Sequence, residues 1–177
     1  MSTKVLTVIS AFVICSVTCG VVSQGRADRG EEPPVPPTRM IPGITTEDSF
    51  PGGCVSCHLN YVDMNMDTRI STLMTRLTEK VEPRLLAKAQ GATPTGVTLL
   101  GRHPEATESL GDIPSACLEC HDRAASKAPD FSRMIHSIHL TGGDENHYLT
   151  LFQGECTHCH KLDASTGAWR TPSESEK

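Results

Sequence analysis

The chain has 177 residues, of which 37% are hydrophobic but only 4% aromatic, and its formal net charge is -5. Acidic and basic side chains are interspersed without a long run of either sign, which excludes the clustered basic patch that a nucleic-acid partner requires. A chain of about 150 residues removes roughly 70% of its surface from water on folding, and aromatic groups usually supply much of that area. A further apolar group is therefore expected in the core.

Residues 1–25 have the pattern of a secretory signal peptide. Lys4 precedes an apolar stretch from Val5 to Val22, and small polar residues follow it. The stretch is nearly as long as the ~20 residues that span a bilayer, so an uncleaved N-terminal anchor is the alternative. We expect an exported protein, in the periplasm or at the cell surface, either free or held by this anchor.

The rest of the chain divides by composition into three parts. Residues 26–49 contain five prolines and predict an extended linker, residues 50–170 predict the main domain, and residues 171–177 predict a disordered tail. From Asp67, taken as an N-cap, apolar residues recur at helical spacing as far as Val81. Pro83 is expected to kink this helix or to begin a second one, which Gly91 would end. Strand signals are scarce.

Six of the eight cysteines form three copies of one motif, Cys-X-X-Cys-His, which is the haem c attachment signature. The cysteines and their following histidines are Cys54, Cys57 and His58; Cys117, Cys120 and His121; and Cys156, Cys159 and His160. Two thiols three positions apart on one helical turn can bind the two vinyl groups of a haem, and the next histidine can then bind the iron. The motifs predict three covalent haem c groups, which would also supply the missing core.

Three other chemistries use paired cysteines. A zinc site needs four ligands, and three pairs each followed by histidine do not divide naturally into such sites. A redox-active dithiol would occur once, near a βαβ pattern. A disulfide framework suits an exported protein but gives no reason for the three histidines. These alternatives are weaker than haem attachment.

If each iron has six ligands, three distal ligands are still needed, and five other histidines compete for them. His136 and His139 lie three positions apart, so one helix can present them to two different haems. We predict these two and His103 as distal ligands, with His147 as the runner-up. His158 lies inside the third motif and is interpreted as a surface residue or as a support for a ligand. Four methionines are alternative candidates for the distal ligand of an iron: Met64, Met66, Met74 and Met134. The surplus of histidines favours bis-histidine ligation and low reduction potentials.

About 45 residues of the chain resemble a known group. The second and third motifs, with Phe131-Ser132-Arg133-Met134-Ile135-His136-Ser137-Ile138-His139 between them, are similar to the His-X-Ile-His element of multihaem cytochromes from metal-reducing and sulfate-reducing bacteria. In those relatives both histidines of the element are distal ligands, which the resemblance implies for His136 and His139. Residues 54–114 have no such resemblance.

Together these patterns predict a small multihaem cytochrome that is mainly α with much loop, with a haem-dominated core and little or no β-sheet. Its predicted function is electron transfer between redox protein partners, without enzymatic activity of its own. One alternative is a small multihaem reductase with one open iron, and another is a haem subunit of a membrane, quinol-oxidising complex. A third is self-association that continues a row of stacked haems between chains.

Overall fold

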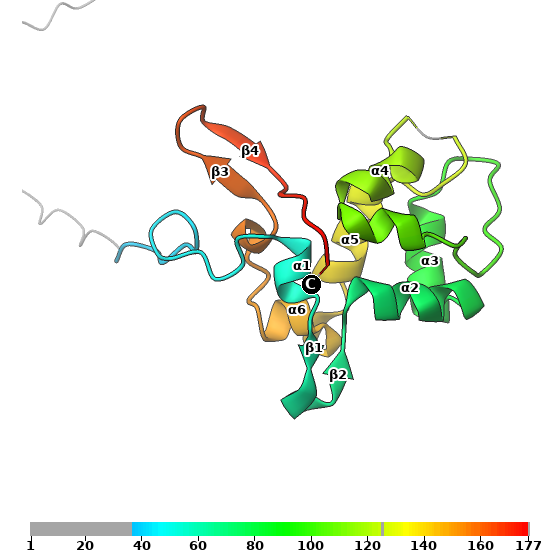
Figure 1. Cartoon of the computed structure of the whole chain (residues 1–177), viewed down its shortest axis with the longest axis horizontal. Coiled ribbons are helices and arrows are strands. Elements are labelled where there is room, and N and C mark those ends of the chain that lie inside the picture. The colour runs from blue at the N-terminus through cyan, green and yellow to red at the C-terminus, as the bar shows by residue number, and fades with distance from the viewer. Residues whose placement is uncertain (1–36, 125, 177) are drawn as a thin grey trace, which may run out of the picture. The chain divides into compact units, whose positions relative to one another are not determined.

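Short helices joined by loops make up most of the fold, and two small hairpins provide all the paired strands among the described residues (Figure 1). The computed structural model describes residues 37–124 and 126–176, so the expected signal or anchor of residues 1–25 lies outside it. One compact unit, Thr38–Lys177, contains the three motifs, and the following paragraphs concern that unit. None of its described helices is long and apolar enough to cross a bilayer. The predicted class, mainly α with little sheet, is confirmed.

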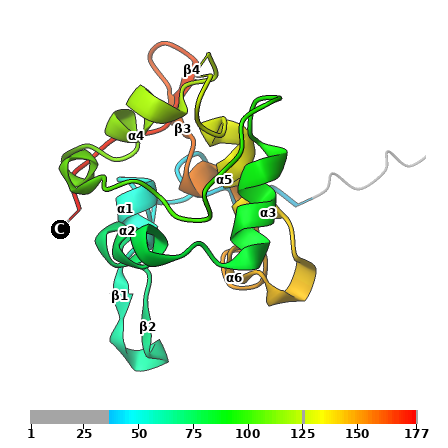
Figure 2. The ribbon, with the colours of Figure 1, turned by 90° about the vertical axis from the view of Figure 1, so that its right-hand side faces the viewer.

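The α-helices are α1 (Cys54–Cys57), α2 (Ile70–Glu79), α3 (Pro83–Gly91), α4 (Ser115–His121), α5 (Phe131–Leu140) and α6 (His147–Thr150). Short 3-10 helices are η1 (Val62–Met64), η2 (Thr107–Gly111), η3 (Gly143–Glu145) and η4 (Cys156–His158). One antiparallel hairpin pairs β1 (Asn60–Tyr61) with β2 (Met66–Asp67), and the other pairs β3 (Lys161–Asp163) with β4 (Ala168–Arg170). Two perpendicular views show the β1–β2 hairpin projecting away from the helices (Figures 1 and 2).

The helix with Asp67 as its predicted N-cap begins two residues later than expected, with Arg69 as its N-cap. Asp67 lies in β2, where its carboxylate binds the Arg69 side chain and accepts a hydrogen bond from the Thr72 hydroxyl at 2.9 Å. Pro83 begins a second helix, α3, because its fixed φ suits the first helical position and the Glu82 side chain caps the amides that follow. This helix ends at Gly91, as predicted.

Helix α5 carries the His-X-Ile-His element. Its N-cap, Asp130, accepts a hydrogen bond from the Arg133 amide at 2.8 Å, which satisfies one of the free donors of the first turn. Both His136 and His139 lie within the ten residues of this helix, as their spacing predicted. The first two cysteine motifs also form short helices, α1 and α4, while the third begins in η4.

Protein side chains alone provide a very small core. Among the described residues, only Val55, Ala92 and Ile113 are buried hydrophobic side chains, and no large side chain is fully buried. A domain of this size normally contains one continuous apolar core in which each member touches several others. The helices are therefore held mainly by loop contacts, hydrogen bonds and partly exposed apolar faces.

Both ends of the unit make more contacts than the sequence suggested. Residues 38–49, expected to belong to a linker, form a turn closed by hydrogen bonds between Gly43, Thr46 and Ile41, and Asp48 binds Lys161 at 2.9 Å. The segment expected as a disordered tail is also docked, since Glu174 pairs through its backbone with Ile113. The domain that the structure describes thus extends beyond residues 50–170 in both directions.

Candidate functional site

Each motif histidine faces a second histidine that the sequence predicted as its possible partner. The ring centroids are 6.1 Å apart for His58 and His139, and 5.9 Å apart for His121 and His103. They are 6.0 Å apart for His160 and His136. Six histidines from different parts of the chain thus form three separate pairs of nearly identical spacing.

This spacing matches two imidazoles that share one metal ion. An imidazole nitrogen binds a first-row metal at about 2 Å, and the ring centre lies roughly 1 Å behind that nitrogen. Two rings on opposite sides of one ion therefore have centroids about 6 Å apart. Rings that pack edge-on in this protein span 4.7 Å, for Phe50 and His158, to 6.5 Å, for Tyr148 and His158, so the distinguishing feature is that each of the three pairs joins a motif histidine to another histidine at the same spacing.

Hydrogen bonds at Nδ1 set the protonation of four of these rings. The Nδ1 atoms of His58 and His121 lie 2.7 and 2.8 Å from the carbonyl oxygens of Thr68 and Pro129. Because a carbonyl oxygen only accepts, Nδ1 must carry the proton, which leaves the Nε2 lone pair free to bind a metal. The same holds for His103 and His139, which donate to the carbonyls of Pro104 and Ile135 at 2.6 and 2.9 Å.

Burial keeps several of these rings neutral. Desolvation is the largest cause that lowers the pKa of His58, His103, His139 and His160. A neutral imidazole is the form that binds a metal, since protonation removes the lone pair. The local environment thus favours the ligand form before any metal contributes.

Helix α5 is shared by all three pairs. His136 and His139 belong to two different pairs, and Phe131 at the start of the helix packs edge-on against His121 at 6.3 Å. Positions three apart on a helix lie on neighbouring parts of its surface. One short element therefore holds two pairs close together and contacts a histidine of the third.

The six motif cysteines differ in exposure, since Cys120 and Cys156 are exposed and the other four are partly buried. No disulfide joins any of the cysteines that the structure describes. Burial, with a smaller contribution from the nearby Cys159 thiol, raises the pKa of Cys54 to about 11 and of Cys57 to about 12. A redox-active dithiol needs a lowered thiol pKa, so these two are not poised for disulfide exchange.

Two histidines stand outside the pairs. His147 begins α6, and its ring faces no other aromatic ring among the described residues. His158 is not a surface residue, because only 7% of it is exposed and its ring packs against Phe50, Phe152 and Tyr148. Tyr148 also packs edge-on against His139 at 5.4 Å, so His158 supports one histidine pair from behind.

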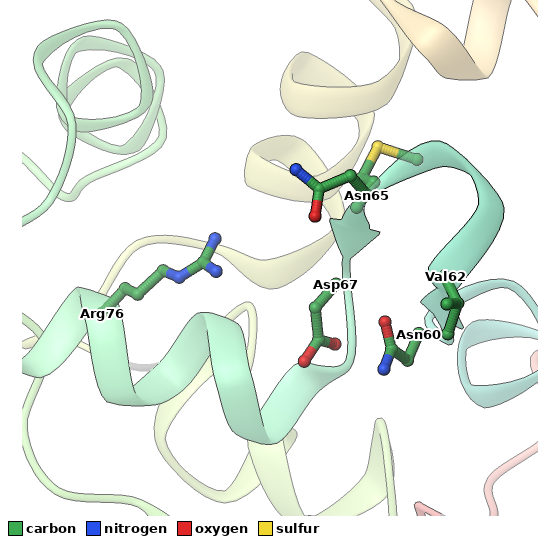
Figure 3. A pocket seen from close by; sticks show the side chains of 6 residues that line it. Asn60, Val62, Asn65, Asp67 and Arg76 are labelled. Atoms are coloured by element: carbon green, nitrogen blue, oxygen red, sulfur yellow. The ribbon is translucent and has the colours of Figure 1, made fainter.

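Two surface hollows differ in chemistry. One, of about 350 Å³, is lined by His121, by apolar side chains that include Leu118 and Phe131, and by polar ones that include Arg123. The other, of about 300 Å³, lies between the β1–β2 hairpin and α2 and is lined mainly by polar groups, including Asn65, Asp67 and Arg76 (Figure 3). No cysteine or histidine lines the second hollow, and Asp67 is already bound to Arg69.

Comparison of the chain with protein-family models, curated proteins and solved structures found no match in any of the three. What the site can hold therefore has to be judged from its own residues.

The residues present fit haem c. Within residues 37–124 and 126–176, no three His, Cys, Asp or Glu side chains gather closely enough to hold a metal ion by themselves. A pair of imidazoles therefore needs additional donors, and a porphyrin brings four nitrogens of its own. Each pair includes the histidine of a Cys-X-X-Cys-His motif, so two thiols lie next to it in the chain. The small protein core leaves apolar faces for flat apolar rings to cover.

The sequence did not reveal the groups that support the paired histidines. The Nδ1 acceptors are mostly backbone carbonyls, which carry no residue-type signal, and Tyr148 and Phe131 look like ordinary packing residues. Only Phe131 belonged to a segment that the sequence had singled out, the His-X-Ile-His region.

Proposed function

We propose that this chain is an electron-transfer protein that binds three haem c groups, each through two cysteines and two histidines. The observation that carries the proposal is the recurrence of a centroid spacing near 6 Å in three pairs, each containing one motif histidine. Bound haem iron supplies reversible one-electron chemistry. The cysteines Cys54, Cys57, Cys117, Cys120, Cys156 and Cys159 would hold the groups covalently.

The paired histidines would keep other ligands from the iron. His58 and His139, His121 and His103, and His160 and His136 would occupy both axial positions at their respective sites. In the His58–His139 and His121–His103 pairs, Nδ1 hydrogen bonds hold both rings, which disfavours the open position that a reductase requires. The arrangement therefore favours a carrier over a small multihaem reductase.

Proximity along α5 would support a relay. His136 and His139 are separated by a single helical turn, so the two sites that they serve must lie close together. The partners expected for such a relay are other redox proteins of an exported chain, including a membrane quinol-oxidising complex. Self-association through stacked haems would be a further way to extend the relay.

The test is a haem count combined with a ligand-binding assay. The full chain, matured in a host that attaches haem c, is expected to yield three haems in the pyridine haemochrome assay. Carbon monoxide added to the dithionite-reduced protein should leave its low-spin bands unchanged. A preparation without covalent haem would overturn the proposal, and a carbon monoxide-binding fraction would favour the reductase.

Matched histidine variants sharpen this test. His139→Ala should open one of the three sites, giving a carbon monoxide-binding fraction of one haem in three, while the haem count stays unchanged. His147→Ala is the control, because the His147 ring faces no partner among the described residues, and it should retain three closed sites. Equal behaviour of the two variants would contradict the assigned ligand set.

A further inference from the structure

Residues 171–176, here called the C-terminal strap, contact residues within or close to each of the three motifs. The strap leaves β4 and turns back towards the helices (Figure 1). Beside the first motif, Pro172 lies against Gly53, with its Cδ atom 3.4 Å from where a Cβ on that glycine would be. Ahead of the second motif, the Ser173 hydroxyl accepts a hydrogen bond from the Ser115 amide at 3.1 Å.

Further contacts hold the strap along its length. Glu174 exchanges two backbone hydrogen bonds with Ile113, at 2.9 and 3.0 Å. At its end, the Glu176 carboxylate accepts hydrogen bonds from the Ser71 amide in the first turn of α2, at 3.0 and 3.2 Å. These bonds come from separate parts of the chain, so the strap is held in one position over its whole described length.

The strap begins beside the third motif. The register of the β3–β4 hairpin places Lys161 opposite Arg170, so the flanking residues His160 and Thr171 come next to each other. The Thr171 hydroxyl oxygen lies 3.3 Å from Nδ1 of His160. The hairpin thus returns the chain to the histidine from which it started.

This contact differs in kind from those of the other paired histidines. Four of them bond through Nδ1 to backbone carbonyls, which no side-chain substitution can remove. Among the described residues, His160 is the one paired histidine whose Nδ1 partner is a side chain. Its partner across the gap, His136, makes no hydrogen bond through its ring with the described residues, so Thr171 is the main polar restraint on this pair.

We infer that Thr171 is a positioning residue that orients His160 and sets the reduction potential of the third site, with the strap holding it in place. This inference rests on the proposed function. If Nε2 of His160 binds iron, Nδ1 carries the proton, and the Thr171 hydroxyl oxygen accepts a hydrogen bond from this N–H group. Accepting that hydrogen bond makes the imidazole a stronger donor, which stabilises the oxidised iron and lowers the potential.

The experiment compares Thr171→Val with Thr171→Ser in the full haem-loaded protein. Valine keeps the branched shape but removes the acceptor, so one of the three potentials in a spectroscopic redox titration should rise while the other two stay in place. Serine restores the hydroxyl and should restore that potential. Thr75→Val is the control, because the Thr75 hydroxyl bonds only to the Ser71 carbonyl on the exposed side of α2.

Two results would overturn the inference. One is unchanged potentials in Thr171→Val, and the other is an equal shift of all three, which would indicate general loosening of the strap. If Thr171→Val folds poorly, Ser173→Ala provides a second test, because it loosens the strap but keeps the Thr171 hydroxyl. The third potential should then move less in Ser173→Ala than in a variant that lacks the strap. Equal shifts in these two variants would also contradict the role of Thr171. The haem count separates this test from the proposed function, because three haems with unmoved potentials refute only the role of Thr171.

Discussion

The three histidine pairs differ in the angle between their ring planes. His103 and His121 are stacked at 14°, His136 and His160 are tilted at 44°, and His58 and His139 are nearly perpendicular at 84°. If both rings of a pair bound one haem iron, each would interact with the d orbital that its plane selects, so parallel rings would act on one orbital and perpendicular rings on two. The three proposed sites should therefore differ in the energies of their iron d orbitals, because the angle between the two rings differs from site to site.

This difference predicts three distinct low-spin signals in the electron paramagnetic resonance spectrum of the oxidised protein. The His103–His121 site should give the most rhombic signal and the His58–His139 site the most axial one. In His103→Ala the most rhombic signal should disappear while the other two persist. Three identical signals, or loss of a different signal in this variant, would contradict the ring geometry.

At the scale of elements, the approach of the first motif to its neighbours depends on one glycine. Gly53 precedes α1 with φ of 60° and ψ of -116°, a conformation that residues with a side chain rarely adopt. The Cys159 carbonyl lies 3.7 Å from where its Cβ would be. This separation is an ordinary van der Waals contact, so the backbone conformation of Gly53, more than a lack of space, favours glycine where the first motif meets the third.

Gly53→Ala should therefore destabilise the protein. The strained backbone conformation costs on the order of 1–3 kcal/mol, while the new methyl group would meet Pro172 at van der Waals distance. The expected result is a lower midpoint in thermal unfolding. Gly91→Ala is the matched control, because nothing lies within 4 Å of its Cβ position, and it should be neutral or slightly stabilising. Similar melting of both variants would argue against strain at Gly53.

On the scale of the whole molecule, an ion pair joins the N-terminal turn to the third motif. The Lys161 ammonium lies 2.9 Å from the Asp48 carboxylate and also donates to the Thr157 carbonyl at 2.7 Å. Burial is the largest single influence and raises the pKa of Asp48, but the hydrogen bonds from Lys161 and the Phe50 amide, together with the positive charge of Lys161, outweigh it and lower the pKa of the carboxyl group. Residues separated by 113 positions are thus linked at one point.

The pH dependence of this link has a definite sign. A carboxyl group whose pKa is lowered by folding stabilises the protein above its unfolded pKa of about 4, and that contribution is lost as the pH falls through the folded value. Lys161→Met should lower the free energy of unfolding at neutral pH by no more than about 1 kcal/mol, because the pair is partly exposed. In denaturant titrations the difference from wild type should shrink in acid.

A surface pair provides the control for this prediction. Arg84 and Glu145 form an ion pair in which both side chains are about three-quarters exposed, so water screens their attraction. Arg84→Met should leave unfolding unchanged at either pH. If the two variants lost equal stability, the Asp48–Lys161 pair would have no special role in joining the ends of the unit.

Local spacing was enough to predict several elements and part of the site. The short helices at the first two motifs, the helix that carries His136 and His139, and the break at Pro83 follow from residues close in sequence, because capping, ring constraints and helical period act over a few positions. The predicted N-cap of α2 was wrong by two residues because Asp67 lies in a strand, where the side chains of Arg69 and Thr72 bind it.

The sequence by itself determined the three motifs and the pool of histidines, since both depend only on residue type and spacing. Only the tertiary structure decided which histidine faces which: His58 with His139, His121 with His103 and His160 with His136. It also decided that residues 171–176 dock instead of forming a free tail, because the β3–β4 register and the backbone pairing with Ile113 join residues distant in the chain. Such contacts carry no local sequence signal, since backbone groups of any residue type can make them.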